Sequence, residues 1–142
     1  MQQQRTAYGW ALRFDRGEDV WEELRAFAER EGVRSGAISG IGSVGECELG
    51  FFVRGRGEYV RRTFTGEFEI ASLTGNFSDL DGRPFPHCHA VLGGDDFAAH
   101  TGHLFRAVVT VTCELQIVTD PGVIRRERRP DLGFNPLALP DG

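Results

Sequence analysis

The sequence predicts a single α+β domain, in which one main amphipathic helix packs on a mostly antiparallel β-sheet. Its 142 residues fit one domain, because domains commonly contain about 100–150 residues. Apolar residues make up 40% of the chain and include eleven Phe, which is enough apolar surface for one core. One segment near the N-terminus has helical apolar spacing, whereas most later segments alternate or are rich in β-branched residues.

The first two expected elements are a strand and the helix. Residues 9–14 (GWALRF) predict a strand, and residues 15–17 predict a turn. Asp19 is a favourable N-cap with Glu22 three residues later, and Gly32 is a natural residue to end the helix. Between these signals one apolar stripe recurs at helical spacing: Val20, Trp21, Leu24, Phe27 and Ala28.

The rest of the domain is expected to be β-structure. Strands are predicted at residues 35–44, 47–53, 58–65, 68–77, 87–92 and 108–118. The last of these (VVTVTCELQIV) has the strongest β-branched pattern in the chain. Residues 54–57 predict a short hairpin connection, and residues 79–84 predict a loop.

The sequence divides into a domain at residues 1–120 and a Pro-rich tail at residues 121–142, which would be ordered only if it docks. No apolar run approaches the roughly 20 residues that cross a bilayer, and the N-terminus has no apolar signal region. We therefore expect a soluble cytoplasmic protein that does not bind membranes. The three cysteines have no CxxC spacing and are expected to be buried free thiols.

Clustered histidines are the most informative feature of the sequence. The four histidines, His87, His89, His100 and His103, lie in a seventeen-residue window. Residues i and i+2 of a strand share a face, so His87 and His89 would present two imidazoles side by side. His103 would supply a third ligand if residues 93–96 turn the chain back antiparallel. We therefore predict a divalent-metal site formed by His87, His89 and His103.

Three neutral imidazoles suit zinc, although nickel, cobalt or iron would accept the same ligands. Cys88 lies between two of the histidines and should point to the opposite face, which leaves one coordination position open. An open position argues against a purely structural metal, which usually has four protein ligands. The alternative is that these histidines make only ordinary hydrogen bonds. We leave His100 out of the site as an exposed polar side chain.

Six motifs occur in order over most of the chain. They are RFDRGE at 13–18, SGAISGIG at 35–42, GEFEI at 66–70, PFPHCH at 84–89, GHL at 102–104 and TCE at 112–114. With these motifs the sequence resembles the PPC (plant and prokaryote conserved) domain family, in its stand-alone prokaryotic type. One departure is that Thr101-Gly102 precedes the third histidine, where the family usually has a Gly-Gly pair.

The resemblance implies an antiparallel sheet flanked by a helix, a homotrimer, and a metal bound by His87, His89 and His103. If a trimer forms, residues 35–44 and Phe51 with Phe52 are plausible contact surfaces, although core packing is the ordinary role of such phenylalanines. The family is also described as DNA-binding, and it more distantly resembles acetolactate decarboxylase, a zinc enzyme. Fold and ligands do not fix the reaction, so whether the chain is an enzyme stays open.

Two functions therefore remain. The first is a DNA-binding or regulatory module with DNA or a protein as partner, although a net charge of -5 weighs against phosphate binding. The second is a small metalloenzyme acting on a carbonyl or carboxylate ligand at the metal. For the second, the candidate catalytic residues are Glu114 and Glu69, as base or ligand support, and Arg13, as a carboxylate clamp, each with a structural salt bridge as its alternative.

Overall fold

A computed structural model describes residues 1–140 of the chain, and it confirms the predicted α+β class. In chain order the elements are β1 (Gln2–Thr6), β2 (Gly9–Asp15), α1 (Val20–Glu31), β3 (Gly36–Val53), β4 (Glu58–Leu80), β5 (Arg83–Gly93), β6 (Ala99–Thr119), β7 (Arg125–Arg126) and β8 (Leu137–Ala138). Among the residues described, no helix is both long enough and apolar enough to span a bilayer.

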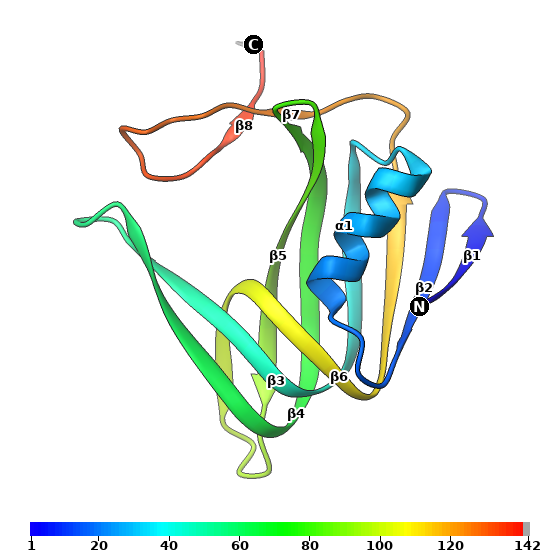
Figure 1. The fold of residues 1–142 in the computed structure, drawn as a ribbon, viewed down its shortest axis with the longest axis vertical. Helices are drawn as coiled ribbons and strands as arrows, with labels where there is room; N and C mark the ends of the chain where they lie inside the picture. The colour runs from blue at the N-terminus through cyan, green and yellow to red at the C-terminus, as the bar shows by residue number, and fades with distance from the viewer. Residues whose placement is uncertain (141–142) are drawn as a thin grey trace.

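One sheet contains all these strands, in the order β1-β2-β6-β3-β4-β7-β8. Its strand pairs are antiparallel except for the parallel contact between β4 and β7. Strand β5 pairs with both β4 and β6, while β3 also pairs with both of them. These four pairings close a ring, and the long strands of this ring curve strongly (Figure 1).

Two segments that the sequence predicts as separate strands are continuous in β3, and the same holds in β4. The register of β3 against β4 shifts between Gly40 and Gly42 and again between Val44 and Glu46. Such bulges bend a strand without ending it, so the sequence signals that suggest breaks mark bends. Strand β1 is not predicted from the sequence, because all five of its residues are exposed and polar.

Helix α1 lies against one face of the sheet, as Figure 1 shows, and forms as predicted. The carboxylate of Asp19 accepts hydrogen bonds from the backbone N–H groups of Trp21 and Glu22, and Gly32 ends the helix in the left-handed conformation with φ 67°. Glu22 does not complete a capping box, because its carboxylate pairs with Arg25 at 2.9 Å. The predicted stripe is buried at Val20, Leu24, Phe27 and Ala28.

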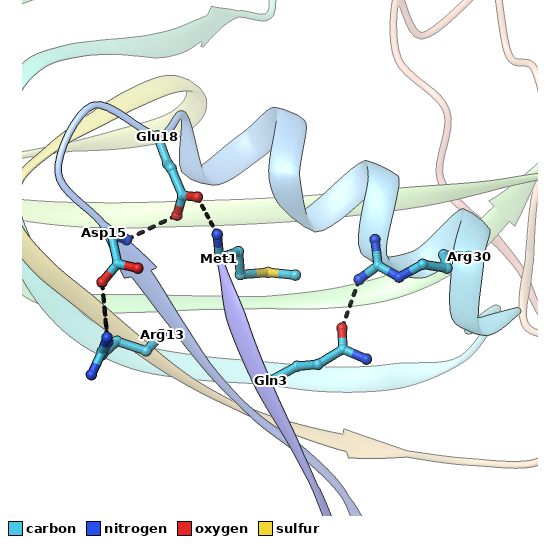
Figure 2. A network of polar contacts seen from close by, with 6 residues as sticks. All are labelled: Met1, Gln3, Arg13, Asp15, Glu18 and Arg30. Atoms are coloured by element: carbon cyan, nitrogen blue, oxygen red, sulfur yellow. Dashed lines mark hydrogen bonds and ion pairs between the residues drawn. The ribbon is translucent and has the colours of Figure 1, made fainter.

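Polar contacts attach the N-terminal strand to the start and end of the helix (Figure 2). The amino group of Met1 pairs with Glu18, whose other carboxylate oxygen accepts a hydrogen bond from the backbone N–H of Asp15 at 2.8 Å. The side-chain oxygen of Gln3 accepts a hydrogen bond from Arg30 at 2.6 Å. Strand β1 is therefore held without apolar burial of its own.

Strand β5 approaches β4 closely at Gly75, which lies opposite Cys88. A Cβ atom at Gly75 would lie 2.3 Å from the backbone oxygen of His87, closer than real Cβ contacts allow. The absence of a side chain at Gly75 thus lets the histidine-bearing strand take its position.

The tail beyond residue 120 docks on the sheet. Its strand β7 contacts β4 where Arg125 lies opposite Asp79, and the backbone N–H of Asp79 donates to the carbonyl of Ile124 at 2.7 Å. Further along, the ring of Phe134 packs on Phe52 with centroids 5.5 Å apart. This docking brings tail residues beside β5, where the histidines lie.

Candidate metal centre

The three predicted ligands converge from two neighbouring strands. His87 and His89 share a face of β5, and His103 on β6 lies directly opposite His89 in the antiparallel register. The ring centroids are 4.8 Å apart for His87 and His103, and 5.4 Å apart for His87 and His89. One nitrogen from each ring lies within 4.8 Å of the other two. Small ring rotations would bring these atoms to the spacing of about 3.4 Å expected around a tetrahedral ion.

The donor set fits a divalent metal such as zinc. His103 is only 8% exposed, and within residues 1–140 its Nδ1 atom has no hydrogen-bond partner. A buried polar atom without a partner is destabilising, and coordination to an ion would satisfy it. The Cys88 side chain is fully buried in the hydrophobic core, so the set consists of three nitrogens.

Burial keeps two of these imidazoles neutral. It is the main cause that lowers the pKa of His87 to about 4, with smaller contributions from the positive charge of Arg126 and from His89. Burial likewise lowers the pKa of His103 to about 3, followed by the effects of His87 and His89. At neutral pH both rings therefore keep a lone pair available for a metal ion.

Arg126, from the docked tail, holds His87 in place. Its Nη2 group donates to His87 Nδ1 at 3.0 Å and to Asn76 Oδ1 at 2.9 Å. Its Nε donates to Ser78 Oγ at 2.8 Å, and its Nη1 donates to the carbonyl of Asn135 at 2.8 Å. An arginine only donates, so His87 Nδ1 must be the acceptor in this arrangement. No pattern in the sequence indicates this contact, which joins residues 39 positions apart.

A cavity of about 190 Å³ opens beside the histidines. His87, His103 and Arg126 supply polar atoms to it. Aromatic side chains form much of the remaining wall: Tyr59, Phe85, Phe105 and Phe134. The ring of His103 lies 4.6 Å from that of Phe105 and 5.0 Å from that of Tyr59. The centre thus adjoins a small, largely apolar space on the side of His87 and His103, whereas His89 is exposed to solvent.

The structure does not bring the three catalytic candidates to the histidines. Glu114 lies on β6 eleven residues beyond His103, a distance of about 30 Å or more along a strand, and it pairs in register with Arg13. Arg13 also forms an ion pair with Asp15 at 3.1 Å. Glu69 lies opposite Gly93 and lines a different hollow.

His100 also lies apart from the cluster. It is paired with Leu92 in the sheet, and its ring lies 4.7 Å from that of Phe64. His100 is partly buried against an aromatic ring, and not fully exposed as the sequence suggests.

A family model matches most of the chain. The model described as the Plants and Prokaryotes Conserved (PCC) domain covers residues 1–120. This confirms the resemblance that the sequence motifs indicate. No curated protein sequence matches the chain significantly.

Solved structures share the whole fold. A proposed DNA-binding protein from Bacteroides thetaiotaomicron is 31% identical, with a TM-score of 0.93 and 96% of each chain covered. A plant- and prokaryote-conserved (PPC) protein from Pyrococcus horikoshii is 28% identical, with a TM-score of 0.86, covering 99% of this chain and 95% of that one. A metal-containing protein from Archaeoglobus fulgidus is 30% identical, with a TM-score of 0.84, covering 98% of this chain and all of the other.

The lowered histidine pKa values predict that the metal-free protein loses stability in acid. Unfolded histidines bind protons below a pH of about 6.5, whereas folded His87 and His103 resist protonation down to about 4 and 3. The unfolded state therefore binds more protons in this window, and the free energy of unfolding should fall as the pH drops from about 6.5 to 4. Urea unfolding at several pH values measures this slope. It should be shallower in His87→Gln and His103→Gln, and an unchanged slope in both variants would contradict the assignment.

Proposed function

The chain belongs to the Plants and Prokaryotes Conserved (PCC) domain family, and we propose that it works by binding one divalent metal ion, zinc by preference, through His87, His89 and His103. The observation that carries this proposal is the buried Nδ1 of His103, which has no partner among the described residues and lies beside two further imidazoles. The metal-containing relative from Archaeoglobus fulgidus supports the same conclusion.

Three histidines leave a coordination position open, and the adjoining cavity gives a small molecule access to it. An ion held in this way supplies Lewis acidity toward a carbonyl or carboxylate, or lowers the pKa of a bound water. His87, His89 and His103 would hold the ion, and in the metal-free protein Arg126 donates a hydrogen bond to His87. A small-molecule site, either regulatory or catalytic, is therefore the function that the geometry supports best.

DNA binding is the second candidate, because two of the similar solved proteins are proposed DNA-binding proteins. Charge pairing on the surface weakens this candidate for the present chain. The sequence has three basic clusters, at residues 54–56, 61–62 and 125–129. Four of their eight arginines have carboxylate partners: Arg56 with Glu58, Arg61 with Glu48, Arg128 with Asp81, and Arg129 with Asp131 and Glu127. Arginines neutralised in this way have less charge to offer to phosphates.

A homotrimer is also part of the proposal. Several large apolar side chains are exposed on β3 and β6, among them Ile41 at 60%, Phe51 at 72% and Val111 at 74%. Exposed apolar side chains in such numbers are a reason to expect contacts between copies of the chain. Sedimentation equilibrium should give a mass near three chains, and a monomeric mass at micromolar concentration would exclude the trimer.

Metal titration of the purified protein tests the ligand set. We expect one zinc ion per chain. His87→Ala, His89→Ala and His103→Ala should each weaken zinc binding by more than about a hundredfold. Loss of a residue that only supports a ligand typically weakens metal binding by about tenfold to a hundredfold, so loss of a ligand itself should cost more. His100→Ala is the matched control and should bind zinc as the parent protein does. Parent-like zinc affinity in any of the first three variants would remove that residue from the site.

Duplex binding at several salt concentrations tests the second candidate. We expect weak binding that disappears between about 50 and 200 mM salt, as for a few non-specific phosphate contacts. Tight binding to one duplex sequence at physiological salt would instead make DNA recognition the better account of the protein.

A further inference from the structure

We propose that Arg126 and the metal ion together bind a small carboxylate in the cavity beside His87 and His103. This inference rests on the proposed metal site and names the class of ligand that the site takes. It assigns to Arg126, a residue of the docked tail, direct contact with that ligand.

The first reason is that Arg126 is a buried cation without a counter-charge. Its side chain is buried at 9% exposure, and among the described residues it forms no ion pair with a carboxylate. Its hydrogen-bond partners Ser78, Asn76, Asn135 and His87 are all neutral acceptors. Buried charges are normally paired, so an arginine in this state indicates a missing anion.

The second reason is that the surroundings of the histidines are positive before any metal binds. Arg61 lies over the ring of Phe105, which lines the cavity, with its guanidinium carbon 3.7 Å from the ring centroid, and it also pairs with Glu48 at 3.5 Å. Arg126 lines the cavity itself, and none of the described residues that line it carries a carboxylate. A divalent ion would add two further positive charges, and an anionic ligand would balance them.

The third reason concerns the donors of Arg126. A guanidinium has five N–H donors, and four of them are engaged in the hydrogen bonds to Ser78, Asn135, Asn76 and His87. Metal binding by His87 breaks its hydrogen bond with Arg126, whichever ring nitrogen is the ligand. If Nδ1 binds the ion, its lone pair is no longer available to Arg126. If Nε2 binds the ion, Nδ1 carries the proton and cannot accept a hydrogen bond. One donor on Nη1 and one on Nη2 are then free.

Two donors on the terminal nitrogens of a planar guanidinium match the two oxygens of a carboxylate. The released donors lie next to the metal ligands, so one acid can contact both Arg126 and the open coordination position. Metal loading therefore precedes and favours acid binding. Two oxygens of inorganic phosphate could accept from the same donors, so the small size of the cavity and the apolar walls are what favour a carboxylate.

The size and walls of the cavity limit the rest of the ligand. Its volume of about 190 Å³ is below the range of about 300–1,000 Å³ that is usual for drug-sized molecules. Aromatic rings of Tyr59, Phe105 and Phe134 face this space, so an apolar remainder of a few carbons fits beside them. The ligand class is therefore a small monocarboxylic or keto acid.

Cobalt(II)-loaded protein allows the test without an enzymatic assay, because its visible spectrum reports changes in coordination. Acetate is titrated as the probe, with acetamide as its neutral counterpart and phosphate as the comparison anion, and calorimetry gives the affinities. In Arg126→Gln we expect acetate to bind roughly tenfold to a hundredfold more weakly, as for loss of charged hydrogen bonds. Cobalt affinity should be unchanged or higher, because a positive charge beside the ion is removed.

Arg129→Gln is the matched control, since Arg129 lies in the same tail and pairs with Asp131 on the surface. It should bind both cobalt and acetate as the parent protein does. Arg126→Lys keeps the charge without the planar pair of donors and should bind acetate with intermediate affinity. This variant keeps the proposal testable if Arg126→Gln prevents the tail from docking.

Several results would overturn the proposal. Equal acetate affinity in the parent and Arg126→Gln proteins would show that Arg126 does not contact the acid. Loss of cobalt binding in both Arg126 variants would show that its role is structural. If acetamide binds with the same affinity as acetate, or if phosphate binds more tightly than acetate, the site is not a carboxylate site. Absence of cobalt binding in the parent protein would instead contradict the metal site itself.

Discussion

The candidate site depends on the antiparallel register of β5 and β6. In this register His89 lies opposite His103, and the two-residue period of β5 puts His87 on the same face as His89. A slip of one residue would turn both histidines into the core and bring Cys88 out. Pairing of β5 with β4 as well as β6 resists such a slip, and Gly75 allows the close approach that this pairing needs.

The second element of the site is its charge. A chain with a net charge of -5 has a locally positive cavity, in which Arg126 lies beside neutral imidazoles. Many other arginines of the described chain pair with carboxylates on the surface. Arg126 thus places a buried positive charge where a metal and a small anion would bind, which favours a small-molecule role for this site.

The sequence predicts those parts of the fold that depend on local patterns. Spacing of apolar residues after Asp19 predicts α1, and the HxH pattern with His103 predicts the convergence of imidazoles. Strand β1 is not predictable from the sequence, because its exposed QQQRT segment has no apolar pattern and forms by pairing with β2. The same is true of Arg126, because its contact with His87 depends on tail docking, and no local pattern encodes a contact between segments so far apart.

X-ray absorption at the zinc edge of the metal-loaded protein tests the central claim most directly, because it measures the atoms bound to the ion. The account predicts three imidazole nitrogens at about 2.0–2.1 Å and one exchangeable oxygen ligand that completes the coordination. A sulfur neighbour at about 2.3 Å, or a shell of oxygen atoms without imidazole, would contradict it.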